Sequence, residues 1–314
     1  MSLLQRLSLR HPRDADADVR VGLCIAAERL VGAVGHFRAG ARPQFSPAPS
    51  FDGPEAAAAW VAWQRHHQPR SRTSLLLHSE HYRILPLDAP RVPPEERKAA
   101  VRYQAQELLD FPAEEAQIDC LDVPAAAPDQ SVSRVFVVAG LKHEIARWMA
   151  RYRDARLELD VVDIPELALR NVSVLAAGES AHIYLHVGFR SSRLVIVWQR
   201  ELCAFRQFEL GARQLAAASD DEVESLVEHL TLDIQRTADA FARQFHGADL
   251  AALWVSSVVR ADALVEILAA LQSLPVRPLR IEDHADWRGP GAVFDLDAGV
   301  DHTLAIGATL RGAV

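Results

Sequence analysis

The sequence predicts an α/β protein built from two halves of similar design. Residues 19–34 have the pattern of a β-hairpin, and residues 181–198 have the pattern of a second hairpin with its turn at Gly188. Each hairpin is followed along the chain by further strands and by helices that can pack on a sheet. The repeated order indicates one type of fold used twice.

The composition is that of a globular protein with room for two domains. The chain has 314 residues, of which 49% are hydrophobic and 24% charged. Its net charge of -8 argues against nucleic acid as a partner, because phosphate contacts need a basic surface. No stretch approaches the roughly 18 apolar residues of a membrane span. The cysteines Cys24, Cys120 and Cys203 are far apart, which predicts neither a disulfide framework nor a zinc site and fits a reducing compartment.

The first domain is expected over residues 19–176, after an N-terminal tail at 1–18. The tail begins with a short amphipathic basic piece, which is either frayed or rests on a membrane surface or a partner. A helix is predicted at 53–67 and a buried strand at 73–78.

A small α+β subdomain is expected as an insertion into this domain at about residues 80–156. Its pattern predicts a strand, a helix, two strands and a second helix, which together make a compact two-layer unit. These elements are expected at residues 82–87, 93–110, 117–123, 134–139 and 142–154. Ile145, Trp148 and Met149 are expected on the inward face of the last helix.

The second domain is expected over residues 177–297, and residues 298–314 are expected to return to the first domain. A strand at 157–164 and a helix that starts at Pro165 lead into it. After the second hairpin, the predicted elements are strands at 201–208, 251–255 and 275–281, helices at 220–245 and 261–272, and a last helix at 298–311.

Several stretches resemble the PilM-type pilus assembly proteins, and they occur in the same order as in that family. They are residues 99–119 with a Phe-Pro pair, 162–169, 208–215 with 232–241, and 303–312. The MshI-type proteins of MSHA pilus biogenesis are the members that the chain most resembles, and the cytoplasmic L component of type II secretion is a more distant relative. The resemblance implies an actin-like, ribonuclease-H-like duplicated fold of two domains with a small inserted α+β subdomain.

The same resemblance implies that the nucleotide site of the family has degenerated. Nucleotide-binding relatives carry a Gly-Leu-Asp-Ile-Gly-like run in the first hairpin, where this chain has Gly22, Cys24 at the Asp place and Ala26 at the second Gly place. His186 stands where an acid precedes Gly188 in the second hairpin. Ser256 and Ser257 replace the glycine-rich loop that binds the nucleoside.

These replacements remove the groups that a magnesium nucleotide needs. Carboxylates organise the hydrated Mg²⁺, and glycines let backbone N–H groups approach the phosphates. The sequence therefore predicts no ATP, no magnesium and no other metal, and a protein that is not an enzyme.

Single residues in these segments have two interpretations each. His186 is either a catalytic base or a hydrogen-bonded interior histidine, and Cys24 is either a nucleophile or a buried strand cysteine. Asp163 is either catalytic or a helix cap. Arg190 and Arg193, around the hairpin tip, either hold an anion or belong to a solvated turn.

A peptide partner is also implied. In PilM-type proteins, the short cytoplasmic N-terminus of a single-span inner-membrane protein, PilN-like, docks in a cleft on the first domain beside the inserted subdomain. The assembly ATPase is a second candidate partner. The expected contacts lie on the predicted helix 95–110 and the strand 82–85, and the alternative is ordinary helix surface and core. The candidate residues are Tyr82, Arg83, Arg102, Tyr103 and Gln106.

Three functions follow from these expectations. The first is a cytoplasmic, nucleotide-independent scaffold of a type IV, MSHA-like pilus assembly platform, held at the inner membrane through its partners. The second is an actin-like ATPase or kinase that still binds Mg-ATP. The third is the cytoplasmic part of a type II secretion L-type component. A cleft reused for another small ligand stays open, and without a nucleotide to sense we expect the halves to keep a closed, rigid relation.

Overall fold

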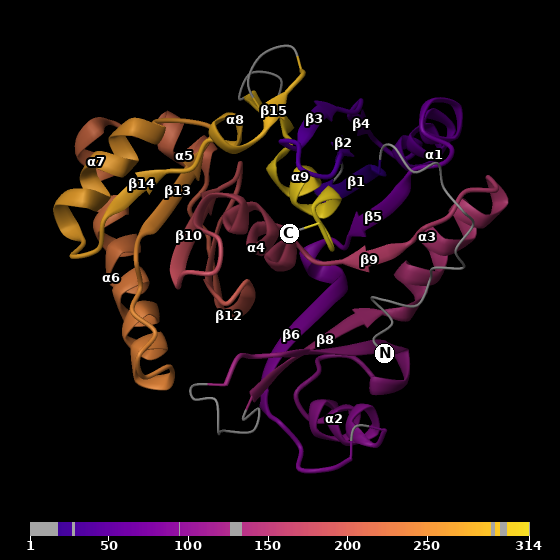
Figure 1. Ribbon diagram of the computed structural model, residues 1–314, viewed down its shortest axis with the longest axis horizontal. Helices are drawn as coiled ribbons and strands as arrows, with labels where there is room; N and C mark the ends of the chain where they lie inside the picture. The colour runs from indigo at the N-terminus through magenta and orange to yellow at the C-terminus, as the bar shows by residue number, and fades with distance from the viewer. Residues whose placement is uncertain are drawn as a thin grey trace.

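The computed structural model describes residues 18–26, 29–93, 95–125, 134–289, 293–295 and 300–313. Two β-sheets lie on either side of a central pair of helices, and a small third sheet lies below them in the view of Figure 1. Of the predicted tail at residues 1–18, only Asp18 falls within the described part, and it begins the first strand.

The first sheet is built on the predicted hairpin. β1 (Asp18–Ala26) and β2 (Arg29–Phe37) pair antiparallel, and β5 (Arg72–Leu76) and β9 (Val161–Asp163) extend the sheet in parallel beyond β1. The full order is β15-β3-β2-β1-β5-β9, with β4 on β2. The short strands β3, β4 and β15 were not predicted; they span Gln44–Pro47, Phe51–Asp52 and Asp286–Trp287.

Two helices cover the outer face of this sheet, namely α1 (Ala56–His67) and α3 (Lys142–Asp154). Trp60 is fully buried, and its indole N–H donates to the Tyr152 hydroxyl over 2.8 Å. Trp148 is buried as predicted, whereas Met149 is 40% exposed, so its predicted inward position is wrong. Met149 directly follows Trp148, and on a helix adjacent residues do not share a face.

The inserted subdomain, called the module below, has the first four of its five predicted elements, in the order strand, helix, strand, strand. The second helix predicted in it, α3, packs with the first sheet instead, since Trp148 and Tyr152 share a core with Val21 and Leu23. The sheet of the module runs β6-β8-β7, all antiparallel, from strands β6 (Tyr82–Asp88), β7 (Ala116–Asp122) and β8 (Arg134–Leu141). Tyr82 pairs with Gly140 at the base of the sheet, where the chain enters and leaves the module. Helix α2 (Arg97–Gln106) is shorter than the predicted 93–110, and short 3-10 helices stand at Ser79–His81 and Ala113–Glu115.

The two faces of the module have different neighbours. Val101 and Ala105 of α2 pack on one face of its sheet, in a core of their own. From the other face, Phe136 makes an edge-to-face contact with Phe205 of the second half, with ring centroids 5.5 Å apart. At the start of β8, Arg134 donates to Gln244 Oε1 over 3.0 Å. The module is therefore packed against the second half.

The second sheet is built on the second predicted hairpin and has the order β12-β11-β10-β13-β14. Its strands are β10 (His182–Val187), β11 (Ser192–Trp198), β12 (Glu201–Phe208), β13 (Leu253–Ser257) and β14 (Val276–Pro278). The strand predicted at 275–281 is thus shorter, because Ile281–His284 forms the short helix α8. Strand β10 pairs antiparallel with β11 and parallel with β13, as β1 does with β2 and β5.

Helices α5 (Ala212–Ala217), α6 (Asp220–Gln244) and α7 (Ala261–Leu271) accompany this sheet, with α6 and α7 on its outer side in Figure 1. The long helix α6 begins with a capping box, because the Ser219 hydroxyl accepts from the Glu222 N–H while the Glu222 carboxylate accepts from the Ser219 N–H. Acidic residues in its first turn complement the helix dipole, as the sequence predicts.

Helices α4 (Pro165–Ala177) and α9 (Thr303–Thr309) fill the space between the two sheets. They approach so closely that a Cβ at Gly307 would lie 2.3 Å from the Ala168 carbonyl oxygen. Asn171 of α4 donates to the Gly307 carbonyl over 2.9 Å. The last helix was predicted over 298–311 but begins only at Thr303, because Val300–Asp301 forms strand β17 with β16 (Phe294–Asp295).

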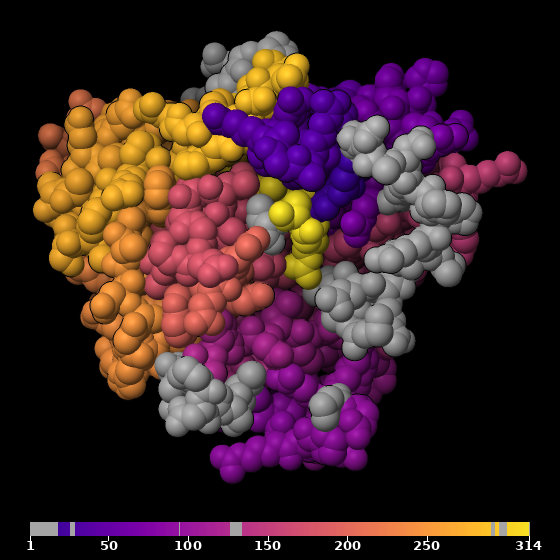
Figure 2. Space-filling model, in the orientation of Figure 1, coloured from indigo at the N-terminus to yellow at the C-terminus, as the bar shows by residue number. Residues whose placement is uncertain are grey.

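Helix α9 returns to the first half, as expected for residues 298–314. The Arg20 guanidinium at the start of β1 donates to the Arg311 carbonyl over 2.6 Å. In Figure 2 the yellow C-terminal residues lie between the indigo first half and the pink and orange second half. None of the helices in the described part of the chain is long and apolar enough to cross a bilayer.

Candidate functional site

A cleft of about 1290 Å³ opens between the two halves. Its walls come from the ends of both hairpins, from the connection between β5 and the module, and from the segment that starts α9. Of the seven residues predicted as the degenerate nucleotide site, Cys24, His186 and Gly188 line this cleft. Gly22, Ser256 and Ser257 are not among its lining residues, and Ala26 ends β1 opposite Arg29.

His186 is the centre of a buried chain of polar contacts. Its Nδ1 lies 3.0 Å from the Ser256 hydroxyl, which in turn lies 2.8 Å from the Tyr184 hydroxyl. Its Nε2 lies 2.9 Å from Oδ2 of Asp301, immediately before α9. His186 is 1% exposed and Ser256 2% exposed. Of the two interpretations of His186, a catalytic base or a hydrogen-bonded interior histidine, these contacts fit the second. The histidine connects the second sheet to the segment that leads into α9.

Asp301 is the functional carboxylate that sequence reasoning missed. Burial raises the pKa of Asp301, but the nearby His186 ring and the Thr303 N–H, which donates over 2.9 Å, lower it more, so the net shift is downward. The carboxylate is therefore held ionised beside a histidine. Its place in the sequence, far from both hairpins, gave no signal that it would meet His186.

Cys24 lies on the cleft wall but is 4% exposed. Burial is the main cause that raises its thiol pKa to about 12, with Arg193 opposing and Asp301 adding to the effect. A thiol with such a pKa is protonated at neutral pH and is a poor nucleophile. The structure thus gives Cys24 the character of a buried strand cysteine.

The predicted glycines and serines have structural tasks. A Cβ at Gly22 would lie 1.9 Å from the Ala305 carbonyl oxygen, so this glycine is needed for the close approach of α9 to β1. The Gly188 N–H donates to Ser191 and closes the hairpin turn. Ser257 closes the turn after β13, because its hydroxyl donates to the Val259 carbonyl over 2.6 Å.

Arginines gather where the β10–β11 turn meets the start of α5. Arg190, Arg193 and Arg213 all line the cleft. The turn and the helix are joined by backbone bonds, from Ala212 N to Gly188 O over 2.8 Å and from Arg213 N to Phe189 O over 3.1 Å. Arg193 lies 3.7 Å from Glu166 Oε1, but its Nε is buried without a hydrogen-bond partner. Arg213 was not predicted as part of any site.

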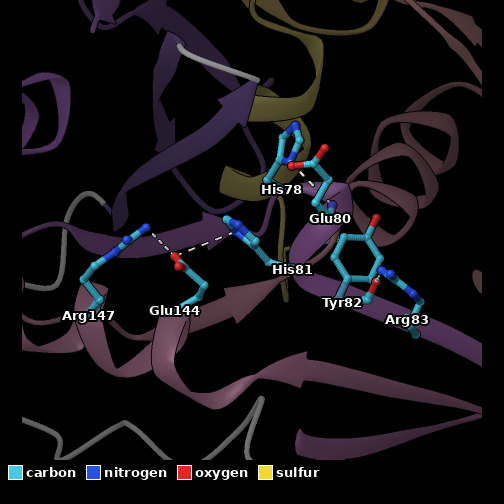
Figure 3. A network of polar contacts seen from close by, with 7 residues as sticks. All are labelled: His78, Glu80, His81, Tyr82, Arg83, Glu144 and Arg147. Carbon is cyan, nitrogen blue, oxygen red and sulfur yellow. Dashed lines mark hydrogen bonds and ion pairs between the residues drawn. The ribbon is translucent and has the colours of Figure 1, made fainter. Parts of the chain in front are cut away.

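The connection from β5 to the module forms the opposite wall and carries two histidines, His78 and His81, that line the cleft. Figure 3 shows His78 close to Glu80, and the buried Glu144 between His81 and Arg147. Burial is the main cause that lowers the pKa of His78, so this histidine is held toward its neutral form.

The five predicted partner contacts differ in their surroundings. Tyr82 is buried, and its hydroxyl donates to Glu166 over 2.7 Å, so it belongs to the core and not to a surface. Arg83 pairs with Asp110 over 2.5 Å, and Arg102 donates to the carbonyls of Ala113 and Ala116. The remaining two, Tyr103 and Gln106, are exposed on α2, Tyr103 at 76%.

Within the described residues, no group of three or more histidine, cysteine, aspartate or glutamate side chains could hold a metal ion. Asp163, the other candidate for catalysis, is 2% exposed; its Oδ1 accepts from the Ile164 N–H, and Arg311 lies 3.5 Å from its Oδ2. The residues that line the cleft thus include the paired carboxylates Asp52 and Asp301, the buried thiol of Cys24 and four arginines.

No protein-family model matches this sequence, and no curated protein matches it. Similarity appears with solved structures. A structure described as the PilM-PilN type IV pilus biogenesis complex aligns with a TM-score of 0.68 at 19% identity, covering 96% of this chain and 100% of the other.

The cytoplasmic domain of EpsL, an inner membrane component of the type II secretion system of Vibrio cholerae, aligns with a TM-score of 0.49 at 10% identity, covering 93% and 95% of the two chains. A Bacteroides thetaiotaomicron protein with an actin-like ATPase fold aligns with a TM-score of 0.47 at 8% identity over 86% and 93%. The chain has the actin-like fold, and in its arrangement it resembles PilM over almost its whole length.

Proposed function

We propose that this protein is a nucleotide-independent adaptor of a type IV pilus assembly platform, of the MSHA type. It would work in the cytoplasm, at the inner membrane through its partners. The full-length similarity to PilM supports the pilus role, and the PilM structure, which is a complex with PilN, supports a PilN-like membrane protein as the partner.

The observation that carries the nucleotide-independent part is the pairing of two of the carboxylates that line the cleft. Asp301 is paired with His186 over 2.9 Å, and Asp52 is paired with Arg29 over 2.6 Å. A magnesium nucleotide needs carboxylate oxygens that are free to orient the hydrated ion. The place of the first hairpin acid is taken by Cys24, whose thiol is protonated.

We propose that the partner peptide docks on the surface of α2. Tyr103 is 76% exposed and Leu108, just beyond the helix, is 56% exposed, and aromatic side chains are enriched among the residues that anchor protein interfaces. Arg102, on the same helix, donates to two backbone carbonyls. The module that carries this surface packs against the second half.

Titration of a synthetic peptide, matching the cytoplasmic N-terminus of the PilN-like protein, tests the docking site. We expect Tyr103→Ala to weaken binding by about tenfold or more, as aromatic anchors of an interface do. Met149→Ala is the matched control, since Met149 is also an exposed apolar residue but lies on α3. Equal affinity of Tyr103→Ala and wild type would remove α2 from the site.

Calorimetry with Mg-ATP at about 1 mM tests the nucleotide-independent role. We expect no hydrolysis and no binding that requires Mg²⁺. Saturable binding accompanied by hydrolysis would favour an ATPase or kinase instead.

A further inference from the structure

Three of the four arginines that line the cleft come from one corner of the second half. Gly211, just before α5, lies so close to the hairpin turn that a Cβ on it would be 2.4 Å from the Arg190 carbonyl carbon. The backbone bonds between residues 212–213 and 188–189 fix the two segments against each other. Arg190 and Arg213 therefore start from adjacent backbone, and Arg193 follows from the first residues of β11.

Two of the three arginines at this corner have no charged partner among the residues that the structure describes. Arg190 and Arg213 have no side-chain hydrogen bond or ion pair with any residue in the described part of the chain. Asp52 is paired with Arg29 and Asp301 with His186. Glu80 and Glu209 also line the cleft, and neither forms an ion pair with these two arginines.

Arg193 adds a second observation that points to a ligand. Its side chain is 14% exposed, and its Nε is buried without a hydrogen-bond partner. Its companion Glu166 lies at 3.7 Å, outside hydrogen-bond distance, and the other oxygen of Glu166 accepts from Tyr82. A buried donor without an acceptor is unfavourable, so an oxyanion that reaches this side chain from the cleft would gain a hydrogen bond.

We propose that Arg190, Arg193 and Arg213 form a metal-free site for a small multivalent oxyanion in the cleft. The planar guanidinium group of an arginine can donate two parallel hydrogen bonds to the oxygens of a phosphate or carboxylate group without a bridging metal ion. A metal-bridged nucleotide would need free carboxylates, whereas this corner supplies cations. The site does not depend on the adaptor role, so either proposal can fail without the other.

Calorimetry in buffer with EDTA tests the site, with pyrophosphate and citrate as separate probes that distinguish a phosphate source from a carboxylate source. We expect at least one probe to bind saturably at or below about 1 mM. Its affinity should fall with added salt, as charge pairing at a partly exposed site requires. Binding should not require Mg²⁺, because the guanidinium groups supply the positive charge.

The variants are Arg190→Gln with Arg213→Gln, both exposed in the protein, and the control is Arg206→Gln, an exposed arginine of β12 outside the cleft. We expect the double variant to weaken binding at least about tenfold, with unchanged thermal stability, and the control to bind like wild type. Three outcomes would overturn the proposal: no saturable binding of either probe, binding only with Mg²⁺, or equal affinity in the double variant and the control.

Discussion

A buried histidine and an aspartate whose side chain is 11% exposed, 2.9 Å apart, link strand β10 to the segment that starts α9. The His186 ring also contacts Ser256, so both of its nitrogens have partners. A pair of this kind adds little over a well-packed apolar pair, but removing one member leaves the other charged and buried. The contact therefore matters most when it is broken.

We expect His186→Ala to lower the free energy of unfolding by about 3–5 kcal/mol, because Asp301 would then be an uncompensated buried charge. Urea unfolding measures the change. The control is His229→Ala, which removes an exposed histidine on α6. A loss for His186→Ala no larger than that of the control would show that the pair contributes nothing.

The thiols give a second prediction at this scale. Burial raises the pKa of Cys24 and Cys203 to about 12 and that of the half-buried Cys120 to about 11. At pH 8 only about one Cys24 in 10⁴ is a thiolate. We therefore expect iodoacetamide to label the native protein slowly and at Cys120 first, with Cys24 and Cys203 labelled only after unfolding. Mass spectrometry locates the label, and fast native labelling of Cys24 would contradict its burial.

Among the elements, α4 and α9 decide how the two halves meet. Their backbones come together at Gly307 and Ala168, at a distance that leaves no space for a side chain. A glycine inside a short helix lowers its intrinsic stability by about 1 kcal/mol relative to alanine. Here the close crossing makes glycine the better residue, because the contact between the helices needs it.

We expect Gly307→Ala to destabilise the protein by about 1–3 kcal/mol, although alanine is the better helix former, because the added methyl group would push α9 away from α4. Thermal unfolding measures this. Ser225→Ala, at an exposed position of α6, is the control and should be neutral or slightly stabilising. A stabilised Gly307→Ala variant would mean that the helices are not held at this separation.

Direct contacts join the three parts of the molecule, which are the first half, the second half and the module. The halves meet through α4 and α9 and through His186 with Asp301, and the module reaches the second half through Phe136 and Phe205. The expectation of a closed, rigid relation between the halves stays a prediction. Solution X-ray scattering would test it: Mg-ATP at about 1 mM should leave the radius of gyration unchanged, because a compound that binds neither state shifts no equilibrium.

Much of this architecture could be predicted from the sequence because its elements have local sequence signals, namely hydrophobic periodicity, turn residues and helix caps. Both hairpins, the module and most helices carry strong periodicity or caps, such as Ser219 before α6. The short strands β3, β4 and β15 could not be found, since two to four residues carry no period and form only by pairing with a neighbour. The likeness of the two halves came from the repeated hairpin order.

The site was predictable only in part. Cys24 and His186 were found because they stand at fixed places in their hairpins. Asp301 and Arg213 were missed because their roles arise from contacts with distant parts of the chain. Tyr82 was placed on a binding surface because one sequence cannot show that its hydroxyl would meet Glu166 in the core.

The pairing of Tyr82 with Gly140 means that the chain passes into and out of the module at a single point. A gene shortened between these positions would need only a tight turn to rejoin the 3-10 helix Ser79–His81 to α3. Such a deletion would remove Phe136 and expose the ring of Phe205 to water. The shortened protein would then be more soluble with a polar residue at position 205. Within the described residues, the strands of the module pair only with one another, so its removal would leave the strand pairing of both main sheets unchanged.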